Sequence, residues 1–145
     1  MNFELTLRLI FSILSIVYIA SIFVLAGSPI VRILAPFNFH SLLHIPLYGI
    51  LTFLLIFSFV PLKMKSINPI NPTNSISSKN SINSITRFLV VAVIALGVGI
   101  ADEIHQAHVP GREASVTDVF LDFVGIALAL SLAFRFLKTK TSLIH

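Results

Sequence analysis

The chain has 145 residues, of which 56% are hydrophobic and 11% are charged, and its mean hydropathy is +0.97. These proportions exclude an ordinary soluble domain, because such a domain covers most of its surface with charged and polar groups. The formal net charge of +4 comes from basic residues that are scattered around apolar segments, so it argues against a nucleic-acid partner and fits membrane lipids with anionic headgroups.

The first predicted element is a transmembrane helix over residues 5 to 26. This apolar run is long enough to cross about 30 Å of hydrocarbon, and Ser28-Pro29 predicts where the helix stops. The next segment, residues 30 to 38, is short, apolar and broken by Pro36. We therefore expect an interfacial connector there, not a second crossing.

A second transmembrane helix is predicted over residues 39 to 60. It contains Pro46 and Gly49, which membrane helices tolerate when neighbouring groups satisfy the freed backbone. We expect a local kink between His44 and Tyr48. The composition then changes to Ser, Asn, Pro and Lys over residues 61 to 86, which predicts a mobile polar loop.

The third predicted span covers residues 87 to 106 and ends before the turn pair Pro110-Gly111. The fourth covers residues 117 to 137. Ser115 and Asp118 have the spacing of a capping box, which predicts that they close the start of this helix. The last two spans should form a hairpin.

The expected fold is therefore an all-α, four-helix transmembrane bundle in one domain, residues 1 to 145. Lysines and arginines are concentrated in the loop of residues 61 to 86 and after the last span. Because positive loops stay inside, this bias predicts a cytoplasmic loop and cytoplasmic N- and C-termini. Three glycines should allow close helix packing: Gly97, Gly99 and Gly125.

Acidic residues gather in one short stretch on the side predicted to face outward. Five of the six lie there: Asp102, Glu103, Glu113, Asp118 and Asp122. Ionisable groups near the bilayer are costly unless they are paired or hydrated, so an arrangement with Arg112 between carboxylates is expected. Function is the default hypothesis for such a cluster.

The same stretch resembles the signature of the VanZ-like family, which is named after a glycopeptide-resistance accessory protein. The signature is an Asp-Glu pair, a Gln three residues later, an Arg, a Ser or Thr, an Asp, and an Asn with a Gly in the last helix. The matching residues are Asp102, Glu103, Gln106, Arg112, Ser115, Asp118 and Gly125, and a further family feature, a His followed four residues later by Tyr, is matched by His44 and Tyr48. The chain departs from the pattern at Asp122, where Asn is usual, and at Ser41, where Lys is frequent.

The resemblance implies a multi-pass protein of the bacterial cytoplasmic membrane with a cell-envelope role, as in teicoplanin resistance. The preferred hypothesis is an outward polar site that binds or modifies a lipid-linked envelope precursor or an amphiphilic antibiotic. An alternative is a membrane-embedded hydrolase or transferase in which Asp102, Glu103 or Asp118 is the base and Arg112 holds an anionic group. A third is a structural or assembly subunit of a membrane complex. An ion pathway ranks last, because spans one and three have no carboxylate at mid-membrane.

Structural roles compete with function at each of these positions. Asp118 could simply cap its helix, and Arg112 could lock the outer hairpin through an ion pair. His44 and Tyr48 share one helical face and are expected to hydrogen-bond another helix. The chain has no cysteine, and His105 and His108 have no compact metal-ligand spacing, so neither a metal site nor a cofactor is expected. Enzymatic activity and oligomeric state stay open.

Overall fold

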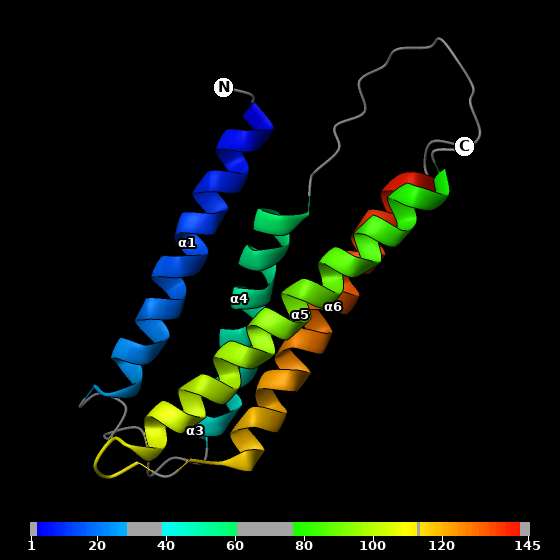
Figure 1. The fold of residues 1–145 in the computed structure, drawn as a ribbon. Coiled ribbons are helices and arrows are strands. Elements are labelled where there is room, and N and C mark those ends of the chain that lie inside the picture. The colour runs from blue at the N-terminus through cyan, green and yellow to red at the C-terminus, as the bar shows by residue number, and fades with distance from the viewer. Residues whose placement is uncertain (1–2, 29–38, 61–76, 113, 143–145) are drawn as a thin grey trace.

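The computed structural model describes residues 3 to 28, 39 to 60, 77 to 112 and 114 to 142. In these ranges the chain is all-α, and its four longer helices form a bundle (Figure 1), which confirms the predicted fold class. The elements are α1 (Phe3–Ala26), the one-turn α3 (Phe39–Leu42), α4 (His44–Phe59), α5 (Ser77–Ala107) and α6 (Val116–Ser142). Three helices, α1, α5 and α6, are long and apolar enough to cross a membrane, and α4 is a shorter apolar helix of 16 residues.

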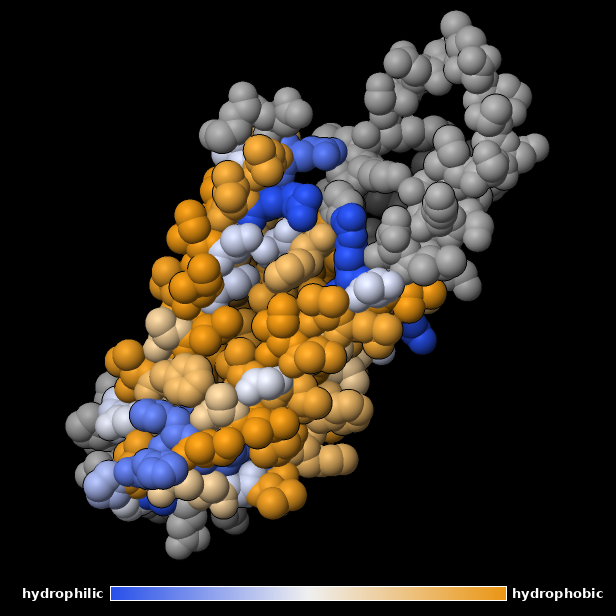
Figure 2. Space-filling model, in the orientation of Figure 1, coloured by the Kyte–Doolittle hydropathy of each residue, from blue (hydrophilic) through white to orange (hydrophobic). Residues whose placement is uncertain are grey.

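The core lies along α4, which packs against α1, α5 and α6. One face of each helix is buried, and the buried residues of α5 recur at the helical period, as in Val91, Ala95 and Gly99. Many large apolar side chains on the opposite faces are exposed. Figure 2 shows the result, an apolar band over the middle of the bundle with polar residues towards both ends. Such a surface requires lipid around it.

The helix is uninterrupted between His44 and Tyr48, where a kink was expected, and a short break lies before it, at Leu43 between α3 and α4. Pro46 lies in the first turn of α4, where its missing N–H removes no helical bond that the turn needs. Regular bonding resumes at once, because the amide of Leu47 donates to the carbonyl of Leu43 at 3.1 Å. The break therefore starts α4 at His44.

Two boundary predictions need correction or fall outside the described residues. The third long helix begins at Ser77, so residues 77 to 86, which were expected in the polar loop, are helical. Extending a formed helix costs much less than nucleating one, and no proline follows Pro72 before the span. The rest of that loop and the predicted connector of residues 30 to 38 lie outside the described ranges.

The first turn of α1 and the last turn of α6 lie at the same end of the bundle, and the α5–α6 connection lies at the other (Figure 1). An even number of crossings requires this arrangement. At the first end, Nε of Arg8 donates to the carbonyl of Ser58 at 3.0 Å, and Arg87 donates to the carbonyl of Phe59 at 3.4 Å. These cations satisfy carbonyls that the end of α4 leaves free. Which side of the membrane this end faces stays a prediction.

The glycines differ in their packing roles. A Cβ built on Gly125 would lie 2.3 Å from the carbonyl oxygen of Ile45, so this glycine brings the backbones of α4 and α6 together. A Cβ on Gly99 would lie 2.7 Å from Oδ2 of Asp122. The prediction for Gly97 is wrong, because it is exposed and nothing described lies within 4 Å of its Cβ position. Composition alone does not reveal which face a glycine occupies.

Candidate functional site

Three buried helix faces become polar at the same end of the bundle. On α5 the apolar stripe continues into Asp102 and Gln106, and on α6 the buried face begins with Asp118 and Asp122. On α4 it begins with His44 and Tyr48. All the side chains of this polar cluster are at least nine-tenths buried: His44, Tyr48, Asp102, Glu103, Gln106, Asp118 and Asp122.

His44 links α4 to α6. Its Nδ1 lies 2.8 Å from Oδ1 of Asp122, and its Nε2 lies 4.0 Å from Oδ2 of Asp118. When Asp122 is ionised it can only accept, and Nδ1 then carries the proton of this hydrogen bond. The other ring nitrogen, Nε2, is directed towards Asp118. A carboxylate that fixes one ring nitrogen in this way sets the orientation of the imidazole.

Asp102 of α5 accepts two hydrogen bonds on one oxygen. Nε2 of Gln106 donates to its Oδ2 at 2.9 Å, and the hydroxyl of Tyr48 donates to the same atom at 3.4 Å. Gln106 in turn accepts from Arg112 through Oε1. One chain of hydrogen bonds therefore crosses α4, α5 and the turn after α5, and its members are Tyr48, Asp102, Gln106 and Arg112.

The turn after α5 brings Arg112 back over the cluster. Gly111 has φ of +82°, and the amide of Arg112 donates to the carbonyl of Val109 at 3.1 Å. Pro110 followed by a glycine with positive φ is the pattern of a type II turn. The guanidinium donates to Gln106 and, at 3.4 Å, to the carbonyl of Ala26. Arg112 is thus linked to Asp102 through the side-chain amide of Gln106. Arg112 was expected between carboxylates, but among the described residues no carboxylate lies within ion-pair distance of it.

Glu103 takes over part of the helix capping that the sequence assigned to Asp118. The backbone amide of Ser115 donates to Oε2 of Glu103 at 2.8 Å. In the predicted capping box this amide would bond the side chain of Asp118. The carboxylate of Asp118 is instead directed into the cluster, near His44. This hydrogen bond therefore ties the end of α5 to the residue that precedes α6 and closes the α5–α6 hairpin.

Each of the four carboxylates leaves one buried oxygen without a hydrogen-bond partner in the described part of the chain. These atoms are Oδ1 of Asp102, Oε1 of Glu103, Oδ1 of Asp118 and Oδ2 of Asp122. Buried polar atoms almost always have a partner, so four orphaned oxygens at one place are unusual.

Three members of the cluster could hold a metal ion: His44, Glu103 and Asp118 each offer one donor atom within 4.8 Å of the other two. The sequence prediction did not include this set. Its members come from three helices, so they have no short spacing in the sequence that would indicate a metal site. The sequence indicated each of the three only as a separate polar candidate. The histidines weighed for metal binding, His105 and His108, are exposed.

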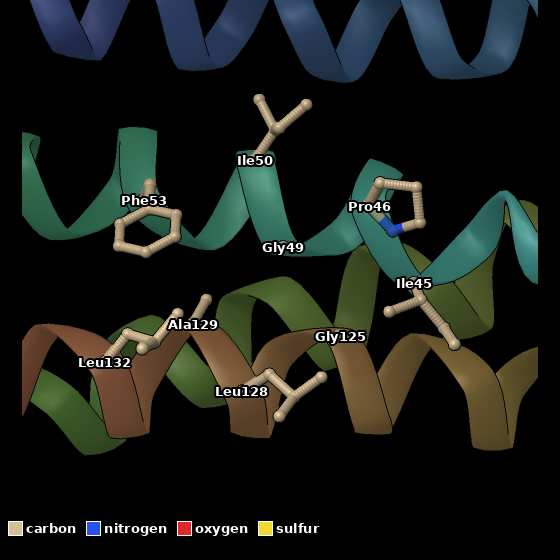
Figure 3. Close-up of a pocket in the computed structure, with 9 residues that line it drawn as sticks. All are labelled: Ile45, Pro46, Gly49, Ile50, Phe53, Gly125, Leu128, Ala129 and Leu132. Atoms are coloured by element: carbon tan, nitrogen blue, oxygen red, sulfur yellow. The ribbon is translucent and has the colours of Figure 1, made fainter.

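An apolar groove between α4 and α6 opens next to the cluster (Figure 3). Its volume is about 220 Å³. It starts at Ile45 and Gly125, which follow His44 and Asp122 along their helices. The lining is apolar throughout: Ile45, Pro46, Gly49, Ile50, Phe53, Gly125, Leu128, Ala129 and Leu132.

The fold and the cluster together define a small helical membrane protein that buries a polar site at one end of its bundle. The sequence model of the VanZ/LLP1 family matches residues 6–138, and the chain therefore belongs to this family. No curated protein and no solved structure matches the chain. The resemblance that the Asp-Glu pair and its following residues indicated is thus confirmed for the chain as a whole.

Proposed function

We propose that this protein binds the polar headgroup of a lipid-linked envelope precursor or of an amphiphilic antibiotic at the outer face of the bacterial cytoplasmic membrane. The observation that carries the proposal is the buried polar cluster, which joins α4, α5 and α6 at one end of the bundle. Burying this many ionisable groups in a membrane protein is costly, and proteins retain them where they serve a ligand or a pathway.

The groove supports an amphiphile over a wholly polar ligand. It runs from Ile45 and Gly125 down the apolar faces of α4 and α6, where Ile50 and Leu128 are half exposed. A hydrocarbon chain in this groove would leave its headgroup at the level of His44 and Asp122. The polar cluster and the apolar groove are therefore neighbouring parts of one site, as the binding of an amphiphile requires.

The roles follow from the contacts. Arg112 lies at the turn, where it is only partly buried. Its guanidinium suits an anionic part of a headgroup, such as a phosphate. Gln106 and Asp102 hold Arg112 in place through their side-chain bonds. Glu103 ties the α5–α6 hairpin to the cluster through Ser115.

The test is the resistance of cells that express the wild type, Glu103→Gln or Arg112→Ala to a lipoglycopeptide, with membrane level and folding measured for each. We expect the wild type to protect and both variants to fail. Glu4→Gln is the matched control, because Glu4 is an exposed acidic residue at the opposite end of the bundle. If folded Glu103→Gln and Arg112→Ala protect as well as the wild type, the cluster is structural and the proposal is wrong.

A hydrolase or transferase is the second candidate, and the His44–Asp122 pair favours it. An imidazole oriented by one carboxylate and directed towards another is an arrangement that general acid–base catalysis uses. The discriminating measurement is mass spectrometry of the lipid-linked precursor after incubation with the purified protein. Chemical conversion that is lost in His44→Gln would identify an enzyme, and recovery of the unchanged precursor would leave binding as the function.

A further inference from the structure

The four buried carboxylates need positive charge. Asp102, Glu103, Asp118 and Asp122 lie together, and within ion-pair distance among the described residues only His44 can supply a charge, when it is protonated. Ionised groups in a low-dielectric interior are stable only when they are paired, hydrogen-bonded or bound to a metal. A protonated imidazole offsets one negative charge and a divalent cation offsets two.

Besides Asp122, two side chains with an orphaned oxygen face His44. Glu103 and Asp118 are 5% and 6% exposed, and each has a buried carboxylate oxygen with no partner in the described part of the chain. One donor atom from each, together with one ring nitrogen of His44, forms a triangle with sides of at most 4.8 Å. A tetrahedral ion with bonds of about 2.1 Å holds its ligands about 3.4 Å apart, so side-chain shifts of about 1 Å close the triangle around an ion.

The imidazole is already oriented as a ligand. Histidines that bind metals usually donate their other ring N–H to a carboxylate, which fixes the tautomer and strengthens the coordinating nitrogen. His44 has this partner in Asp122, at 2.8 Å from Nδ1. Its Nε2 is directed towards Asp118.

We propose that His44, Glu103 and Asp118 bind one divalent first-row transition metal ion, with Zn²⁺ as the first candidate, and that Asp122 holds His44 in the coordinating orientation. One imidazole and two carboxylates suit such ions, whereas Mg²⁺ and Ca²⁺ take oxygen ligands. Three protein ligands leave at least one coordination position for water or for an oxygen of a bound molecule. The metal site stands apart from the proposed headgroup binding, since it can be measured with no amphiphile present.

The experiment is equilibrium dialysis of the full chain, purified in detergent and stripped with a chelator, against Zn²⁺. We expect one ion per chain, and His44→Gln and Asp118→Asn should weaken binding by at least about 100-fold, more than the loss typical of an outer-shell partner. Asp102→Asn is the comparison, since it removes a buried carboxylate of the same cluster that is outside the donor set. Its loss of Zn²⁺ affinity should be smaller than that of Asp118→Asn, because it removes charge and no ligand. Equal binding by the wild type and His44→Gln, or equal loss in Asp102→Asn and Asp118→Asn, would overturn the proposal.

A measurement on the wild type alone covers the case in which a variant does not fold. Zn²⁺ and Co²⁺ should raise the Tm of the stripped protein by several degrees, and Mg²⁺ at the same concentration should not. Bound Co²⁺ should also show visible absorption bands of nitrogen and oxygen ligation. The same Tm with Zn²⁺, with Mg²⁺ and with chelator would mean that protons neutralise the carboxylates and no metal site exists.

Discussion

Replacing Gly125 by alanine places a methyl group between the backbones of α4 and α6. The new Cβ would lie 2.3 Å from the carbonyl oxygen, 3.0 Å from the carbonyl carbon and 3.1 Å from the Cα of Ile45. All three atoms are backbone atoms, so no side-chain rotation relieves the overlap. To reach ordinary contact the two helices must separate by about 1 Å.

Two effects oppose each other in this variant. Alanine favours the helix over glycine by up to about 1 kcal/mol, whereas overpacking a close contact costs about 1–3 kcal/mol. Gly97→Ala isolates the first effect, because nothing described lies within 4 Å of its Cβ position. We therefore expect the free energy of unfolding of Gly125→Ala to lie about 1–3 kcal/mol below that of Gly97→Ala.

The assay is reversible unfolding in mixed micelles titrated with sodium dodecyl sulfate, followed by far-UV circular dichroism. Because Ile45 adjoins His44, the same displacement should lengthen the 2.8 Å contact between His44 and Asp122, so Zn²⁺ binding should weaken as well. Equal stability of Gly125→Ala and Gly97→Ala would refute the close approach of α4 and α6 on which this reasoning depends.

Two further variants test single contacts in the same assay. Asp122→Asn keeps an acceptor for Nδ1 of His44 and removes one buried charge, so stability should stay the same or rise, whereas Asp122→Ala leaves the ring without that partner and should cost about 1–3 kcal/mol. Equal losses in both would show that the hydrogen bond contributes nothing. Arg8→Ala removes the donor to the carbonyl of Ser58 and should lower the free energy of unfolding by about 1 kcal/mol. A neutral result would mean that water serves that carbonyl equally well.

The features that were predictable from the sequence are those that depend on hydropathy. Spans of about 20 apolar residues are a strong signal, so the all-α bundle and the cores of its long helices were predictable from the sequence. The ends of the helices were less predictable. The polar residues from Ser77 onward belong to α5, but they have no hydropathy signal that distinguishes them from a loop. Hydropathy also averages over all faces, which is why Gly97 and Gly99 looked equivalent and are not.

The members of the site were predictable one by one, but their partners were not. Helical spacing placed Asp118 and Asp122 on one face, and the structure has both on the buried face of α6. Which carboxylate meets His44 depends on how α4 and α6 pack, over a separation of 78 residues for Asp122. The capping spacing of Ser115 and Asp118 was a local rule overridden by Glu103 from another helix. Local rules fail where tertiary contacts offer a better partner.

The break at Leu43 also bears on the thickness of the surrounding bilayer. Alone, α4 has 16 residues, and at 1.5 Å per residue it rises about 24 Å, less than the roughly 30 Å of a typical hydrocarbon core. Leu43 keeps helical backbone angles, with φ of −67° and ψ of −19°, so α3 extends the span. Together residues 39 to 59 rise about 31 Å. The turn before the break therefore supplies the length that α4 lacks for a crossing.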